Sequence, residues 1–532
     1  MIHHHDSTAQ DPDRDAESHD PASSLRATLL VLVVGLLGRA IQISNGVLFP
    51  ERAATPAWWL AAAFGVMCIA AFVPIPRMCT PRTADALFTA LAAIVLLASC
   101  AQLLEDAPGV YLNLMEAGAY TPYLMGSAVL AMLGGVALAG AGWLRHAALL
   151  LMLLTFVLLG AWVIRNSPSP RIDVYVFQRD SAAALSRGQN PYTITFPDIY
   201  ARNPEFYAPG LAANGVVHFG YPYPPLPLLM VMPAHTMFDD VRYAHLAAIA
   251  LAAAMIAYGA GGISPGGACI ARSFAFRSAP FVGACLLLAM PRSFFIIEQS
   301  WTEPLTALLL TATVVSWVRW PAVMPFVLGL LLASKQYVPA AAALAWLLVP
   351  GSHDSRRRGA MAWPMQQLAL PAHRSALSSD LLLFGIVLLK ASIVAAVVTL
   401  PLALRDLDAF VSSVLTLQVR QPYRPDSLSF LAWYGRGAGS DWVGPGWIGF
   451  AALAVSVVLS LWRCPRTPAG FACAFAVCYF AFFAFGKQAF ANYYYLVIAA
   501  ACVSIGLTGA GPCVGFPAAT APSVPAGSSE TG

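Results

Sequence analysis

Charged side chains are scarce in this sequence. Of its 532 residues, only 11% are charged and 58% are hydrophobic. Apolar runs of roughly 18 to 24 residues recur along the chain, and runs of that length match the hydrocarbon thickness of a bilayer. Such a composition excludes a single soluble core. The sequence therefore predicts an all-α polytopic membrane protein.

Two further absences narrow the function classes. The ten cysteines form no CxxC pair, and none lies in residues 166–222 or 405–441, so the sequence implies no disulfide or zinc framework. The net charge of +4 comes without a basic patch interleaved with aromatic residues. Nucleic acid is therefore not an expected partner.

The amino-terminal segment lacks the apolar stretch of a signal peptide. His3, His4 and His5 precede an acidic, proline-containing stretch, which predicts a disordered cytoplasmic tail over residues 1–25. A catalytic metal site is not expected there, because nothing would order the histidines. Residues 509–532 are rich in Pro, Ala, Ser and Gly and predict a second disordered tail.

The basic loops predict the topology of the spans. Arg77, Arg82 and Arg145 lie in alternate short loops, which places the amino end inside and the loop 166–222 outside. The pattern predicts about 14 crossings, within a range of roughly 12 to 14, and both termini inside. The expected spans are 26–48, 57–75, 84–104, 120–142, 147–165, 243–262, 279–297, 304–318, 321–335, 338–350, 381–404, 443–462, 468–485 and 490–508.

One apolar segment does not fit this alternation. If residues 223–238 crossed the membrane, the later basic loops would fall on the wrong side. The segment carries four prolines, which lack the N–H that a continuous helix needs, so we expect a re-entrant or interfacial half-helix. These prolines are Pro224, Pro225, Pro227 and Pro233.

The longest polar interruption, residues 166–222, is the expected site of the chemistry. Its first part, Asp173 to Arg187, favours an amphipathic helix that Gly188 ends. Helical spacing puts Asp173, Asp180 and Arg187 on one face, with the two carboxylates about 10 Å apart. An acid beside a membrane helix is a functional candidate. Two alternatives remain open: Asp173 is a helix N-cap, and Asp180 is a solvated or arginine-paired surface residue.

The order of the motifs carries a resemblance to a known family. Asp173 follows a membrane helix, and Gly188-Gln189-Asn190-Pro191-Tyr192 and Tyr223-Pro224-Pro225-Leu226 come after it. In this order they resemble the GT-C class of polytopic glycosyltransferases, in particular the bacterial branch that uses polyprenyl-phosphate sugars such as polyprenyl-phosphate mannose. The likeness covers a transmembrane core at 145–508, with the outer loops 166–222 and 405–441. Residues 26–144 are extra transmembrane helices at its amino end.

The resemblance implies a reaction and roles for several residues. By motif position Asp173 is the general base of an inverting transfer, with Asp180 as the second acidic candidate. The departing phosphate requires cations, and Lys335 and Lys487 lie at predicted outer helix ends. Each lysine could instead reach the membrane interface without a catalytic role. The further cation candidates of the second outer loop are Arg420 and Arg424.

Polar and apolar candidates surround these groups. A tyrosine or tryptophan near the membrane surface is also typical of an interfacial aromatic belt. The aromatic residues among and next to these candidates could therefore bind a sugar or simply belong to that belt. The candidates for binding sugar or acceptor are His218, Gln299, Glu303, Gln336, Tyr337 and Asn492, and those for a lipid groove are Tyr223, Leu226 and Leu229.

The resulting hypothesis is a glycosyltransferase of the bacterial inner membrane. Its site would face the periplasm and move a sugar, with mannose as the suggested one, from a polyprenyl-phosphate donor to a glycan, lipid or protein acceptor. No cofactor or bound metal is required by the pattern, although a divalent cation stays open. The rival hypotheses are a transporter or flippase and a non-catalytic membrane assembly subunit, and the proline-broken half-helix also fits the former.

Overall fold

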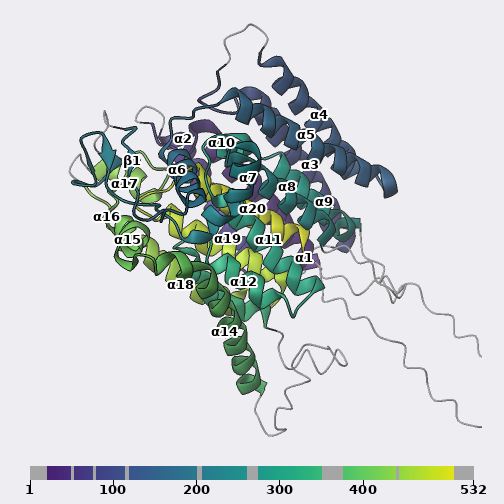
Figure 1. Cartoon of the computed structure of the whole chain (residues 1–532). Coiled ribbons are helices and arrows are strands. Elements are labelled where there is room, and N and C mark those ends of the chain that lie inside the picture. Colours follow the sequence, from purple (N-terminus) through teal and green to yellow (C-terminus); the bar gives the residue numbers. More distant parts are fainter. Residues whose placement is uncertain are drawn as a thin grey trace, which may run out of the picture.

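The computed structural model describes residues 21–49, 53–75, 80–113, 119–200, 206–259, 274–349, 376–438 and 442–508. Most of these residues are helical (Figure 1). Both predicted tails, 1–25 and 509–532, lie outside the described residues except for the last few residues of the first. The basic loop that contains Arg356, Arg357 and Arg358 lies outside them as well.

Within the described ranges, seven helices are long and apolar enough to cross a membrane. This agrees with the predicted class, an all-α membrane protein. The seven are α1 (Pro21–Ser44), α2 (Ala54–Phe72), α3 (Pro81–Glu105), α4 (Thr121–Ala139), α5 (Gly142–Asn166), α8 (Arg242–Gly259) and α14 (Ala376–Ala403).

Shorter apolar helices complete the bundle. They are α7 (Pro225–Phe238), α9 (Phe274–Leu288), α11 (Glu303–Arg319), α12 (Met324–Leu332), α18 (Trp447–Arg463), α19 (Pro468–Ala484) and α20 (Ala491–Gly506). At 1.5 Å per residue, the 14 residues of α7 extend about 21 Å, less than the roughly 30 Å of a hydrocarbon core. The length of α7 is therefore that of a half-helix, as the prolines indicate.

Three predicted spans are not continuous α-helices. The span predicted at 279–297 stops at the end of α9 and resumes in α10 (Ser293–Glu298), because Pro291 lies in the break and has no N–H to donate. The span predicted at 321–335 contains only the nine residues of α12. The one predicted at 338–350 is a 3-10 helix, Val338–Leu348, that begins beside Pro339.

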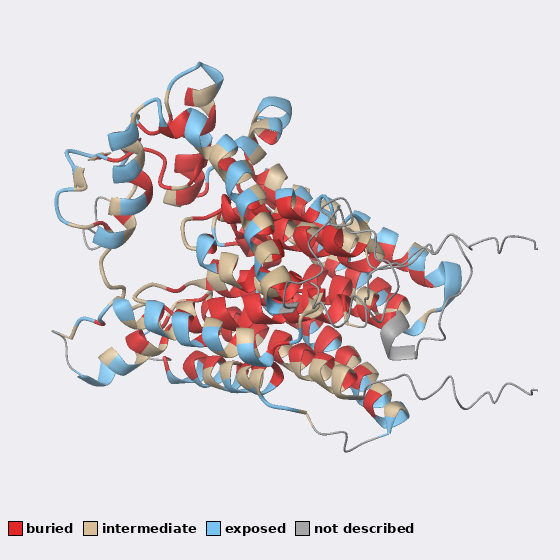
Figure 2. Cartoon of the chain, turned by 90° about the horizontal axis from the view of Figure 1, so that it is seen from below, coloured by how far each residue is buried: buried red, intermediate tan, exposed pale blue. Residues whose placement is uncertain are grey.

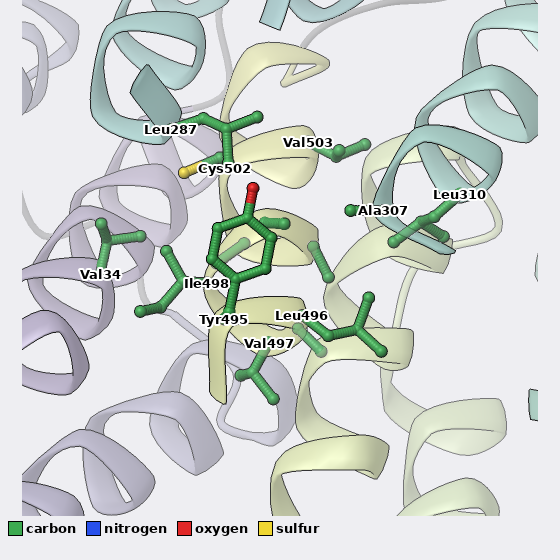
Figure 3. Close-up of a cluster of buried hydrophobic side chains, with 14 of the residues drawn as sticks. Val34, Leu287, Ala307, Leu310, Tyr495, Leu496, Val497, Ile498, Cys502 and Val503 are labelled. Carbon is green, nitrogen blue, oxygen red and sulfur yellow. The ribbon is translucent and has the colours of Figure 1, made fainter. Parts of the chain in front are cut away.

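Helix α20 forms the centre of the main hydrophobic core. Its Tyr495 is fully buried and lies among Val34 of α1, Leu287 of α9 and Leu310 of α11 (Figure 3). The same continuous cluster of buried residues extends from Ala27 to Leu507. The first helices therefore share one core with the carboxyl-terminal helices. Figure 2 shows buried residues concentrated in the middle of the bundle and exposed residues along its outer helices.

A second, smaller unit lies at one end of the bundle, to the left in Figure 1. It contains α6 (Asp173–Ser186), the short strands β1 (Phe196–Pro197), β2 (Ala212–Ala213) and β3 (Val216–Val217), α15 (Leu407–Val411), a π-helical turn (Ser412–Thr416), α16 (Leu417–Arg420) and α17 (Phe430–Ala438). The strands form an antiparallel sheet in the order β1-β3-β2. Residues of α6, β1, β3 and α16 belong to one hydrophobic cluster, so the two predicted outer loops fold together.

The end of α1 is fixed against this second unit and against α20. Gly46 follows α1 with a φ of +74°, and a Cβ at this position would overlap the backbone nitrogen of Ala491. The next residues pair with the loop before α17: Leu48 N–H donates to the carbonyl of Asp426 at 2.7 Å. A side chain at residue 46 would be strained by both the backbone conformation and the neighbouring backbone.

We expect Gly46→Ala to lower the free energy of unfolding by about 1 to 3 kcal/mol, because a non-glycine residue is strained there. The matched control is Gly65→Ala in α2, where a new Cβ meets no atom within 4 Å. That change should stay within about 1 kcal/mol of the parent. Thermal unfolding of the detergent-purified variants measures both effects. Equal midpoints for the two variants would contradict the close packing at Gly46.

Candidate functional site

The first candidate residue stands where a new helix begins. Pro168 and Pro170 follow α5 and cannot continue it, and α6 then runs from Asp173 to Ser186. Gly188 ends α6 in the left-handed conformation, with a φ of +77°. The helix predicted at 173–187 is therefore confirmed within one residue.

Helix α6 is buried more deeply than a helix lying on a membrane surface. Its Phe177 ring lies 4.7 Å from that of Phe196 in β1 and 5.5 Å from that of Phe219. Tyr175 and Val176 are buried too. The apolar face of α6 thus packs on the folded loop that follows it, and this packing fixes the position of Asp173 at the start of the helix.

Asp173 is not the N-cap of α6. Ile172 holds that position, and the Asp173 carboxylate accepts a hydrogen bond at 2.8 Å from the N–H of the adjacent Val174. Its own N–H donates to the Tyr200 hydroxyl at 3.3 Å. The capping bond to a residue two or three positions further on, which the N-cap alternative requires, is not formed.

The surroundings of Asp173 are aromatic and contain one nearby cation. Within the described residues the carboxylate forms no ion pair. Desolvation raises the pKa of Asp173 to about 6, against the opposing effect of the Val174 hydrogen bond and the Arg424 charge. Five tyrosines lie within electrostatic range of it: Tyr111, Tyr200, Tyr207, Tyr223 and Tyr493. We call these five the tyrosine shell.

Asp180 lies in a different environment. Its carboxylate accepts a hydrogen bond at 2.8 Å from the guanidinium of Arg179, and both side chains are partly exposed. Asp180 is therefore an arginine-paired surface residue, which was the alternative left open by the sequence. Although Asp173 and Asp180 were expected on one face of the helix, their carboxylates have different partners.

Lys335 and Glu303 form a buried ion pair. The Lys335 ammonium lies 3.0 Å from Glu303 Oε1, and the two side chains are 4% and 0% exposed. The ammonium also lies 4.3 Å from the centre of the Tyr223 ring, and the Tyr337 hydroxyl donates to the same Glu303 oxygen at 3.4 Å. The pair compensates the charge of Lys335, while Glu303 Oε2 has no partner among the described groups. This cluster adjoins the tyrosine shell through Tyr223.

Lys487 lies near the two candidate arginines. Its ammonium donates to the carbonyls of Val419 and Gln421, at 3.0 and 2.7 Å, on either side of Arg420. Its carbonyl accepts from the N–H of Arg424 at 3.1 Å. Burial lowers the pKa of Lys487. We call Arg420, Arg424 and Lys487 the cation cluster.

One acid lies beside the cation cluster. Arg424 is paired with Asp426 through two hydrogen bonds of 2.7 and 2.8 Å, whereas Arg420 is exposed at the end of α16. The guanidinium of Arg424 also stacks on the Phe206 ring, 4.1 Å from its centre. Arg424 is the cation whose charge acts on Asp173, and no hydrogen bond or ion pair among the described residues joins the cation cluster to the Lys335–Glu303 pair.

The remaining candidates divide between the site and the scaffold. Tyr223 and Tyr337 contact the Lys335–Glu303 pair, and Gln336 and Asn492 lie beside Tyr337 and Tyr493 in the chain. Gln299 is buried and donates to Glu298 at 2.9 Å, and His218 is exposed at the end of β3. In α7, Leu226 is buried in the core, whereas Leu229 is 40% exposed and remains open to a lipid chain.

Two buried polar groups were not found from the sequence. His245 in α8 lies 2.9 Å from the side-chain oxygen of Gln178 in α6, and the Gln178 amide donates to the carbonyl of Ser300. Glu298, fully buried in α10, is the second. An isolated histidine and glutamate within apolar segments are the only sequence signal, and that signal does not reveal their partners. No group of three or more His, Cys, Asp or Glu side chains in the described part of the chain could hold a metal ion.

Comparison with protein-family models, with curated proteins and with solved structures gave no match.

Replacing Asp173 by asparagine should stabilise the protein at neutral pH. Asp173 is half-buried, and its pKa of about 6 in the folded state, against 3.8 ordinarily, means that folding favours the protonated acid, so the cost of the partly desolvated charge grows as pH rises from about 4 to 6 and is complete above that. We expect Asp173→Asn to raise the free energy of unfolding by up to about 3 kcal/mol at pH 8 and by little at pH 4.

Thermal unfolding of the purified variant across this pH range measures the difference from the parent. Asp180→Asn is the matched control, because its carboxylate is partly exposed and paired. If Asp173→Asn lowered stability equally at pH 8 and pH 4, the carboxylate would be structural.

Proposed function

We propose that this protein is a membrane glycosyltransferase that uses a polyprenyl-phosphate sugar, with Asp173 as its general base. The observation that carries the proposal is an ionisable acid that has no ion pair among the described residues, lies within electrostatic range of the tyrosine shell and of Arg424, and stands at the start of a buried helix. Structural acids in apolar surroundings are ion-paired, as Glu303 is, or accept several hydrogen bonds, as Glu298 does, whereas a base must keep an oxygen available for the acceptor.

The properties of Asp173 suit this reaction. With a pKa of about 6 it is ionised at neutral pH and is a stronger base than an ordinary aspartate. It would take the proton of the acceptor hydroxyl as that oxygen forms a bond to the anomeric carbon. The bond from that carbon to the phosphate oxygen breaks, and the phosphate leaves with the electron pair. A single displacement of this kind inverts the anomeric centre. Aromatic rings, such as those of the tyrosine shell, suit the apolar faces of a sugar.

The cation cluster is our choice for the departing phosphate. Lys335, which the resemblance favours, already has its charge compensated by Glu303 within a buried pair. Among the described residues the cluster forms one ion pair, Arg424 with Asp426, so three cations leave it with an excess of positive charge for a phosphate. We therefore assign Lys335 and Glu303 to the wall of the sugar site, where Glu303 Oε2 has hydrogen-bonding capacity left.

The membrane setting completes the proposal. We infer 12 to 14 crossings of a bacterial inner membrane, with α6 and the site on the periplasmic side, where nucleotide sugars are absent and lipid-linked sugars replace them. The exposed side of α7, which includes Leu229, would contact the prenyl chain. The acceptor is a glycan, lipid or protein, and mannose remains the sugar that the resemblance suggests.

A transporter is the second candidate, and one observation favours it. The α9–α10 break and the short α12 are discontinuous helices next to buried polar groups, which is typical of transporter binding sites. The glycosyltransferase explains in addition why an acid is kept at the start of α6 without an ion pair. Transport of a sugar lipid without turnover of the donor would favour the transporter.

We expect Asp173→Asn to reduce turnover of polyprenyl-phosphate mannose by about 10² to 10⁴, because the amide cannot accept a proton at neutral pH. Donor binding should remain close to that of the parent. Release of polyprenyl phosphate by the purified protein in lipid nanodiscs measures turnover. Asp180→Asn is the control and should retain most of the activity, so near-normal turnover of Asp173→Asn would refute the assigned base.

We expect Arg420→Gln to raise the KM for the donor by about tenfold, since one charge-assisted contact to phosphate contributes roughly 1.5 kcal/mol. Arg463→Gln is the control: Arg463 is the last residue of α18, whose first turn lies near Lys487, so about 24 Å of helix separates it from the cation cluster. The two variants are compared in donor titrations at low and high salt. If both changes raised the KM equally, or if neither raised it, Arg420 would not belong to the phosphate site.

A further inference from the structure

The segment between α3 and α4 reaches the candidate site from the amino-terminal helices. Residues 107–113 follow α3 and lie against α10, and they end where Asn113 N–H donates to the carbonyl of Asn166 at 2.7 Å. These residues precede the core to which the resemblance applies. Their contacts therefore show how the amino-terminal helices are connected to the candidate site.

The segment is held by a buried carboxylate. Glu298 Oε2 accepts the N–H of Val110 at 2.7 Å, and Oε1 accepts the N–H of Tyr111 at 2.8 Å. The Gln299 amide donates to the same carboxylate at 2.9 Å. Gly109 lies so close that a Cβ there would overlap the Glu298 carboxylate. Glu298 forms no ion pair within the described part of the chain, so this fully buried acid is satisfied mainly by two backbone amides of the segment.

A second buried side chain holds the beginning of the segment. The guanidinium of Arg292, 5% exposed, donates to the carbonyl of Ala107 at 3.0 Å and to that of Gln42 at 3.2 Å. It also lies 3.3 Å from the carboxylate of Asp106. Both anchors, Arg292 and Glu298, flank α10, so the segment is fixed to the core at two points.

The segment then contacts the residues that precede the base. The Tyr111 hydroxyl donates to the carbonyl of Arg171 at 2.8 Å. Arg171 lies two residues before Asp173, and Tyr111 itself belongs to the tyrosine shell. A chain of hydrogen bonds thus runs from Glu298 through the backbone of Tyr111 and its hydroxyl to the start of α6.

We propose that residues 107–113 hold the start of α6 in place and that Tyr111 is a positioning residue for Asp173. The proposal rests on the proposed function only for its effect on turnover; the mechanical link is independent of the reaction. In this proposal the amino-terminal helices help to position the candidate base through residues 107–113. Without the Tyr111 hydrogen bond, the residues before α6 are freer to move, and water reaches Asp173 more often.

Tyr111→Phe tests the link, and Tyr120→Phe is the matched control. Tyr120 also donates its hydroxyl to a backbone carbonyl, that of Asp106 at 3.0 Å, but at a position distant in the chain from α6. We expect Tyr111→Phe to lower kcat for polyprenyl-phosphate mannose about 2- to 10-fold, as for the loss of one hydrogen bond. KM should change little, and Tyr120→Phe should leave both unchanged.

The pH profile separates positioning from a general loss of structure. Among the described residues the ionisable groups that act on Asp173 are Arg424 and the tyrosine shell, and burial raises the pKa of Asp173 itself to about 6. Better hydration in Tyr111→Phe should move the acid midpoint of the kcat/KM profile below 6, toward the ordinary value for aspartate. A variant that merely contains less folded protein would keep the midpoint of the parent.

Hydrogen–deuterium exchange provides a measurement without turnover. Tyr111→Phe and Glu298→Gln should both speed the exchange of backbone amides in residues 172–176, and Glu298→Gln should also speed that of Val110 and Tyr111. Tyr120→Phe should not affect residues 172–176. Unchanged exchange there in both test variants would overturn the proposal. If the parent transfers no sugar but these exchange rates rise, the proposed function fails and the positioning link stands.

Discussion

The structure depends on how each carboxylate is compensated in a bundle that has little water. An ion in such surroundings is costly unless opposite charge or hydrogen-bond donors replace its hydration. Glu303 has Lys335, Asp426 has Arg424, and Glu298 has two backbone N–H groups. Among the described residues Asp173 has the hydrogen bond from the adjacent Val174 N–H, the hydroxyl of Tyr200 nearby and the charge of Arg424, but no ion pair. That difference in compensation is what distinguishes a candidate base from structural acids.

The same requirement connects the amino-terminal helices to the site. Glu298 can be buried because the segment after α3 supplies two N–H donors, and Arg292 can be buried because carbonyls of Gln42 and Ala107 accept its protons. Compensation of these two charges therefore draws on residues that precede Arg292 and Glu298 in the chain by 185 to 250 positions. Together with the continuous core from α1 to α20, these bonds make the first helices part of the framework of the site.

Lys335 shows that the role a cation can have depends on the partner that the fold gives it. The sequence places Lys335 and Glu303 among the candidates separately, one for phosphate and one for sugar or acceptor. Their ion pair changes what each can do, because a compensated ammonium attracts phosphate less than an uncompensated one. Lys487, chosen for the same reason, instead joins two arginines through backbone carbonyls.

The sequence by itself determined the membrane class, the helix from Asp173 and its end at Gly188, and the short proline-rich helix from Pro225, because composition, periodicity and proline act locally. It also predicted as continuous spans the segments around Pro291 and Pro339, where local apolarity concealed the breaks. Only the tertiary structure decided that Lys335 meets Glu303, that Asp180 turns to Arg179, and that Tyr111 reaches Arg171. The last of these joins residues 60 positions apart, and no periodic pattern encodes which distant backbone group a buried or half-buried polar side chain will find.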